Sequence, residues 1–302
     1  MEPHLARPFR IAAIFGRHGP HIVTGSILDL DPEDIYFGPL LRSIQGELGE
    51  RATLELVNAD PTTYVDLGKQ FDALIIVATE LSELPTLRSL CRSNAVFVAV
   101  GANFGGDNAD IPTVDCENRE GGVTAARHLI ELGHRELACI NLATDHIDHS
   151  DRMHGFLETA AKAGYTVDPD RCLMNDGYRY DLFPELIGDW VHRLILRRKM
   201  PTAIMGCDFN MARTAMDVLY ARAVDVPLDV SVMGFDDPPS ADKQIPPMTT
   251  VRQPVHDMGA VAARRIMDAL LDPAGRRPVV GRHTLPTELV VRDSTIPPRH
   301  LR

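Results

Sequence analysis

The sequence has little of three things that each point to a particular class of protein: basic charge, long apolar runs and paired cysteines. Its 42 acidic residues exceed its 31 basic ones, giving a formal net charge of −11. That balance argues against a broad surface for nucleic acid or an anionic membrane on this chain. No run approaches about 18 consecutive apolar residues, so the sequence predicts no transmembrane helix.

The five cysteines are odd in number, widely scattered and without a CxxC pair. This pattern favours reduced thiols and provides neither a disulfide framework nor a zinc site. The N-terminus, MEPHLARPFRIAAIFG, has no secretory apolar segment followed by a small-residue cleavage site. Both observations predict a cytoplasmic protein without a membrane partner.

Motifs of catalysis are also missing. The sequence contains no GxSxG, Walker A or HExxH pattern. The acids Asp236 and Asp237 are adjacent, which does not make an acid/base pair across a site. The glycine-rich stretch 101–106 lacks the GxGxxG spacing and the following helix of a nucleotide-binding turn. The sequence therefore predicts no enzymatic activity and no cofactor.

What the chain does contain is an apolar fraction of 44% over 302 residues, enough for two domains of roughly 150 residues each. Short apolar runs alternate with helical patterns, which predicts doubly wound α/β lobes with parallel sheets. The stretch 60–72 leaves room only for a truncated helix, and the first loop, 16–34, is long. The expected strands are 10–15, 53–57, 73–78, 95–100, 137–142, 203–206, 230–235 and 285–292, with a strand end around 173–177. The expected helices are 36–48, 81–93, 120–132, 150–163, 182–198, 210–222 and 256–271.

The stretch 226–258, VPLDVSVMGFDDPPSADKQIPPMTTVRQPVHDM, contains the most informative strand. Its apolar run stops at two acids and two prolines, which end any regular element. Ligands of open α/β sheets bind beyond the carboxyl ends of strands, so Asp236 is placed to accept hydrogen bonds from a ligand's hydroxyl or amine groups. The alternative is that Asp236 and Asp237 only cap the next turn.

This stretch resembles the effector-binding core of the LacI/GalR family of bacterial transcription regulators, which carries the pattern VPxDVSVxGFDD…PPLTTVRQP…MG. The segment 117–140 resembles the family's DN…GG…A..HLIELGHR.IA.I, with Glu117 in place of the leading Asp. The resemblance runs from about residue 10 to residue 295. It implies two similar type I periplasmic-binding-protein-like lobes, joined by three crossovers, with a small polar effector in the cleft between them. The implied division is a lead 1–9, a first lobe 10–141 plus 254–282, a second lobe 142–253 plus 283–296, and a tail 297–302.

The resemblance also implies site residues. Arg152 stands where the family's S..R..GF pattern has an effector-contacting arginine, and its guanidinium fork suits hydroxyls, carboxylates or phosphates. The alternative is a solvated surface arginine. Tyr36 and Phe37 fall at the implied cleft lip, where they either stack on a ligand or pack in the core. The other positions implied to line the cleft are Asn118, Gln253 and, as a stacking residue, Tyr178.

Cys207 departs from the family, which often has Asn at this position. A thiol offers no amide donor and acceptor, so this change argues against an ordinary sugar effector. Asp208 fits the N-cap of the following helix and has a structural interpretation.

The stretch DHIDHSD, residues 145–151, places His146 and His149 three apart among carboxylates. A metal site would need a further ligand cluster at defined spacing, so a solvated polar loop is the preferred interpretation. The same holds for His18 and His21 in the first loop.

These observations predict the effector-sensing and dimerisation core of a LacI/GalR-type regulator. Its expected partners are a small-molecule effector, a second copy of the chain, and DNA only through a helix-turn-helix. The family's reader domain takes about 60 residues, whereas nine residues precede the first expected strand. Either this is part of a longer regulator or it is a stand-alone sensor without its own DNA-binding domain. A solute-binding protein of a transport system is the other alternative.

Overall fold

The structure is a computed structural model that describes residues 7–15, 36–77, 81–101, 104, 108–177 and 179–299. Tyr178, His18 and His21 lie outside these residues, as does nearly all of the long first loop. The predictions made for them therefore stay predictions.

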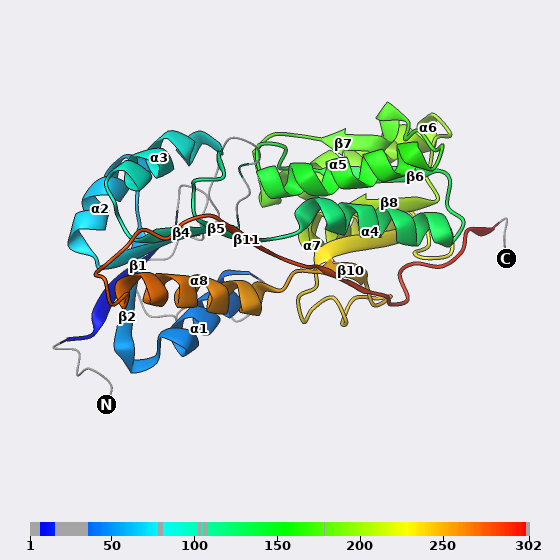
Figure 1. Cartoon of the computed structure of the whole chain (residues 1–302). Coiled ribbons are helices and arrows are strands. Elements are labelled where there is room, and N and C mark those ends of the chain that lie inside the picture. Colours follow the sequence, from blue (N-terminus) through cyan, green and yellow to red (C-terminus); the bar gives the residue numbers. More distant parts are fainter. Residues whose placement is uncertain are drawn as a thin grey trace. The chain divides into compact units, whose positions relative to one another are not determined.

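The first compact unit, Met1–Cys116 with Pro254–Leu285, is built on a six-stranded sheet in the order β11-β5-β4-β3-β1-β2. All neighbouring strands in it are parallel. In Figure 1, α1 and α8 lie on one face of this sheet and α2 and α3 on the other. The central strands are buried on both faces, which explains their unbroken apolar runs. The strands are β1 Phe9–Phe15, β2 Ala52–Asn58, β3 Ala73–Val77, β4 Phe97–Val100, β5 Thr113–Cys116 and β11 Arg282–Leu285; the helices are α1 Phe37–Leu48, α2 Tyr64–Gln70, α3 Leu84–Arg92 and α8 Val255–Leu270.

The second unit, Glu117–Gln253 with Pro286–Arg302, has a six-stranded sheet in the order β12-β10-β9-β8-β6-β7. It is parallel except for the antiparallel pair of β10 and β12. Helices α4 and α5 cover one face, and α6 and α7 the other (Figure 1). The predicted fold class is thus confirmed. The strands are β6 Leu137–Asn141, β7 Cys172–Met174, β8 Ala203–Gly206, β9 Ser231–Asp236, β10 Thr249–Arg252 and β12 Glu288–Val290; the helices are α4 Asn118–Glu131, α5 Ile147–Lys162, α6 Phe183–Leu196 and α7 Phe209–Tyr220.

The first chain crossing between the units lies at Cys116/Glu117, which corrects the expected boundary near residue 141. The reason is the close packing of α4 on α5. A Cβ on Gly122 would collide with the Arg152 carbonyl, and a Cβ on Gly155 with the Arg119 carbonyl. Strand β6 then pairs with β7 and β8, so the whole segment from α4 onward belongs to the second unit. The other two crossings fall at Gln253/Pro254 and Leu285/Pro286.

The expected final strand, 285–292, is wrong as a single element. The chain forms β11 in the first sheet, then Pro286, then β12 in the second sheet. Proline lacks the N–H that a sheet ladder needs, so it suits the point where the chain leaves one sheet for another. The short strands β5 and β10 were not predicted, whereas the truncated helix between β2 and β3 is present as the seven-residue α2.

None of the helices in the described part of the chain has both the length and the apolar character needed to cross a bilayer.

Candidate ligand-binding site

Polar groups gather at the carboxyl ends of neighbouring strands in the second unit. Asp236 ends β9, while Cys207 and Gln253 follow β8 and β10 on either side of it. The first residue of α4, Asn118, and Arg152 in the second turn of α5 complete the group. Five of the residues predicted from the sequence are therefore brought to one edge of one sheet, the edge at which open α/β folds bind ligands.

Arg152 is the centre of this group. It is only 1% exposed, so the alternative of a solvated surface arginine is wrong. Its Nε donates to Asn118 Oδ1 at 2.8 Å, and its Nη1 donates to the Cys207 carbonyl at 2.8 Å and to Asp236 Oδ1 at 3.3 Å. The guanidinium carbon lies 4.0 Å from the centroid of the Phe235 ring. Hydrogen bonds and an aromatic face together fix the orientation of the fork.

Asp236 adopts an unusual backbone conformation, with φ of +80° at the end of β9. Its Oδ1 accepts from Gln253 Nε2 at 2.5 Å as well as from Arg152, and its Oδ2 accepts from the Phe209 N–H at 3.2 Å. Burial raises the pKa of the Asp236 carboxyl, while the charge of Arg152 opposes that effect. Left-handed conformations of non-glycine residues cluster at functional sites, and Asp is among the residues that tolerate them.

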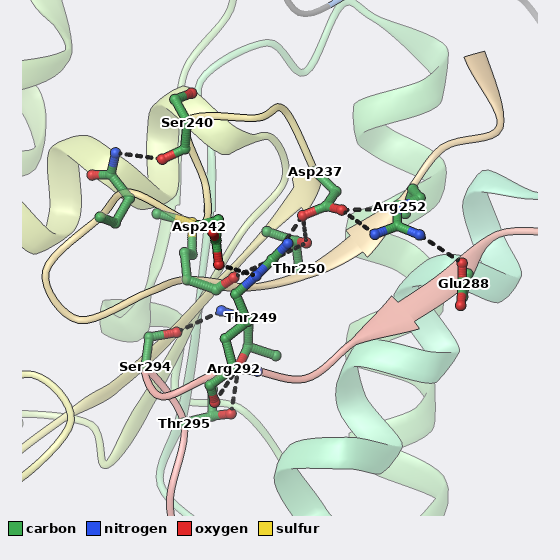
Figure 2. Close-up of polar contacts among 12 residues, drawn as sticks. Asp237, Ser240, Asp242, Thr249, Thr250, Arg252, Glu288, Arg292, Ser294 and Thr295 are labelled. Carbon is green, nitrogen blue, oxygen red and sulfur yellow. Dashed lines mark hydrogen bonds and ion pairs between the residues drawn. The ribbon is translucent and has the colours of Figure 1, made fainter. Parts of the chain in front are cut away.

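Asp237 also has a positive φ, +58°, but it faces a different set of partners. Figure 2 shows two arginines converging on it: Arg292 Nη1 donates to Oδ1 at 2.7 Å and Arg252 Nε to Oδ2 at 2.8 Å. Thr250 Oγ1 donates to Oδ1 at 2.8 Å. Burial works against ionisation, yet the hydrogen bonds from Arg292, Thr250 and Arg252 hold the pKa of Asp237 below its usual value. Asp237 therefore ties β9 to β10 and to the segment after β12.

The stretch around His149 differs from the expected solvated loop. Helix α5 begins at Ile147, three residues earlier than predicted, so His149 lies inside it and is buried. Its Nδ1 is 3.1 Å from Asp148 Oδ1, and its Nε2 is 3.5 Å from Asp208 Oδ2. Burial disfavours the charged ring, but the charge and hydrogen bond of Asp148 dominate and raise the pKa of His149 to about 10. In turn, the charge and hydrogen bond of His149 hold the pKa of Asp148 well below its usual range, against the effect of burial.

Asp208 is the N-cap of α7, as expected, and accepts from the Met211 N–H at 2.6 Å. Its neighbour Cys207 contributes to the site through its carbonyl. The Cys207 thiol is buried 3.7 Å from the thiol of Cys139. The residue that replaces the family's Asn thus presents backbone rather than a side-chain amide to Arg152.

Tyr36 and Phe37 belong to the first unit, at the start of α1. The Phe37 ring packs edge-on against Phe15 and Tyr36, with centroids 5.5 and 5.4 Å apart. A Cβ on Gly101 would collide with the Tyr36 hydroxyl. Both side chains are half-buried and pack against the core of their own unit, at the carboxyl ends of β1 and β4. A contact with ligand stays a prediction for both.

Three features of the site were not identified from the sequence: the Phe235 ring under Arg152, the buried His149, and Asp148, whose Oδ2 lies 3.5 Å from Arg152 Nη2. The i, i+4 spacing of Asp148 and Arg152 on a helix is a signal that predicts their pairing. The place of Phe235 depends on Gly121, where a Cβ would collide with the ring, and no local pattern reveals that contact.

Comparison with known proteins agrees with this geometry. The family model described as "Periplasmic binding protein-like domain" matches residues 126–295. The HTH-type transcriptional regulator DegA of Bacillus subtilis (strain 168) is 31% identical over 277 residues, which cover 88% of this chain and 79% of DegA. The HTH-type transcriptional repressor PurR of Aliivibrio salmonicida is 26% identical over 226 residues. The PurR match covers 75% of this chain and 65% of PurR, so the chain spans just under two thirds of that relative's length.

A solved structure, the complex of transcriptional regulator CelR with cellobiose, matches with a TM-score of 0.77 and 26% identity. The match covers 96% of this chain and 85% of that one. The chain therefore belongs to the LacI/GalR family of transcription regulators and has the periplasmic-binding-protein-like fold of that family's effector-binding core.

Proposed function

We propose that this chain senses a small polar metabolite at the carboxyl edge of its second sheet and passes the binding event to DNA-binding domains. The observation that carries the proposal is a network from different elements, in which Arg152 donates to Asn118 and Asp236, and Gln253 also donates to Asp236. A buried polar network that ends at strand termini is a suitable place for a ligand, since its groups are already oriented.

The polar groups of the network favour a ligand that both donates and accepts hydrogen bonds. Arg152, Asn118 and Gln253 supply donors, and the Asp236 carboxylate is an acceptor. Sugars, sugar derivatives and other hydroxyl-rich metabolites have this character, and a relative of the chain, CelR, has been solved with cellobiose. The Cys207 substitution favours a derivative or another polar metabolite over an ordinary sugar.

We further propose that the protein acts in the cytoplasm as a homodimer and catalyses no reaction. Its known relatives are transcription regulators. With a net charge of −11, the chain is poorly suited to hold DNA itself, so a helix-turn-helix, attached or on a partner, would make that contact. Ligand and operator affinities would then be reciprocally linked.

A thermal-shift screen against sugars, sugar phosphates, purines and carboxylates tests the proposal. A ligand present at about 100 times its Kd stabilises the protein by about 2.7 kcal/mol, which raises the melting temperature measurably. We expect Asp236→Asn to remove the shift and Arg119→Ala, a surface arginine on α4, to keep it. The proposal is wrong if no compound of these classes raises the melting temperature, or if Asp236→Asn binds the hit as tightly as the parent.

A further inference from the structure

The first turn of α5 brings together two imidazoles and a carboxylate. His146, Asp148 and His149 each offer a ligand atom, and these atoms all lie within 4.8 Å of one another. The two histidine rings are edge to face with centroids 5.5 Å apart. We propose that these three side chains, which adjoin the Arg152 network, form a binding site for a divalent transition-metal ion of the Zn²⁺ type.

The donor set selects the kind of ion. Imidazole nitrogens suit Zn²⁺, Co²⁺ and Ni²⁺, whereas Mg²⁺ and Ca²⁺ need oxygen ligands. Two histidines and one carboxylate are the protein ligands of many zinc sites that keep one position for water or a ligand oxygen. His146 is the N-cap residue of α5 and His149 lies in its first turn, so both rings reach the same end of the helix.

Groups around the three side chains provide a second layer of support. Asp208 Oδ2 lies 3.5 Å from His149 Nε2, and Asp208 is itself fixed by the Met211 N–H. On the other side, Arg152 Nη2 lies 3.5 Å from Asp148 Oδ2. Metal-binding histidines generally donate their second N–H to a carboxylate, and metal-binding carboxylates are generally held by a hydrogen-bond donor. Both partners are in place here.

Charge favours a dication as well. Asp148 and Asp236 pair with the guanidinium of Arg152, and Asp208 lies against His149; Asp208 and Arg152 are almost fully buried. Buried charges are normally paired or bound to a metal.

The test uses the full chain, purified without a histidine tag and freed of metal with a chelator. Zn²⁺ is titrated calorimetrically and Co²⁺ by visible absorption. We expect one equivalent to bind and Co²⁺ to give the strong visible bands of a low-coordinate site. His146→Ala and His149→Ala should each weaken Zn²⁺ binding by at least about tenfold. His154→Ala, an exposed histidine on the same helix, is the matched control and should bind as the parent does.

Melting curves in chelator establish that each variant folds, and the half-buried His146 provides a variant with little effect on packing if His149→Ala is unstable. The proposal is overturned if the double variant His146→Ala/His149→Ala binds Zn²⁺ as the parent does, if His154→Ala weakens binding as much as His146→Ala, or if Co²⁺ keeps the spectrum of the hexaaqua ion. No effector is added, so failure of this test leaves the proposed sensing function untouched.

Discussion

Asp236 and Asp237 are neighbours with the same side chain and positive backbone φ, and both bond arginine, yet they lie in two different polar clusters. Asp237 is enclosed by Arg252, Arg292 and Thr250, all of which donate to it (Figure 2). Asp236 is bonded by Arg152, which also contacts Asn118, the Cys207 carbonyl and Asp148. The pKa of Asp237 is lowered and that of Asp236 is raised. Asp237 thus holds strands together through two arginines, whereas Asp236 depends on one arginine that also bonds other groups.

Loss of Arg152 should have the largest effect, because the Asp236 cluster depends on one cation. Arg152→Ala leaves the partly buried carboxylates of Asp236 and Asp148 without the cation that pairs with both. We expect the free energy of unfolding to fall by about 3–5 kcal/mol, measured by urea denaturation. Arg119→Ala, on the exposed surface of α4, should change it by no more than about 0.5 kcal/mol. Equal losses in the two variants would contradict the central role of Arg152.

Asp237→Ala should rank second. It removes the acceptor of two arginines, of which Arg292 is mostly buried. Hydrogen bonds to charged groups contribute about 1.5–3 kcal/mol, and we expect a loss of this size in urea denaturation. The affinity for any ligand found in the screen should stay within about twofold, a change under ~0.5 kcal/mol. A variant that keeps its stability but loses the ligand would reverse the roles assigned to the two acids.

The pH dependence of stability should distinguish the two acids by sign. The lowered pKa of Asp237, set by Arg252 and Arg292, contributes stability above the unfolded value of about 3.9 that is lost as pH falls through the folded value. Asp237→Asn should therefore be most destabilising near neutral pH and less so in acid.

The raised pKa of Asp236, beside Arg152, Asp208 and His149, has the opposite effect, since its contribution to stability is lost as pH rises. Relative to the parent, Asp236→Asn should become more stable with increasing pH, and urea denaturation from about pH 3 to 7 measures both slopes. Parallel slopes for the two variants would refute the distinction.

The outer ion pair of the Asp237 cluster should matter least. Arg252 and Glu288 are 3.0 Å apart, but Glu288 is 69% exposed. Exposed pairs contribute roughly 0–1 kcal/mol, so Glu288→Ala should lower the free energy of unfolding by less than about 0.5 kcal/mol. A loss as large as that of Asp237→Ala would mean that β12 is held from its exposed side rather than through Asp237.

Much of the fold could be predicted because buried parallel strands have to be apolar on both faces. The runs at 10–15, 203–206 and 230–235 each become a central strand of a sheet. The crossing at Cys116/Glu117 could not be predicted in this way. Strand β6 has the same local pattern whichever sheet it joins, and the contact of Gly122 and Gly155 between α4 and α5 assigns it to the second unit.

The site shows the same division. The sequence by itself determined that Arg152 and Asp236 are polar groups at the ends of regular elements, because a helix start and a strand end are visible in local patterns. Only the tertiary structure decided which neighbouring acid joins which cluster. Asp236 meets an arginine 84 residues earlier in the chain, and Asp237 meets one 55 residues later. Two identical adjacent residues differ only in the direction of their side chains, and contacts over such separations exist only once the second unit has folded.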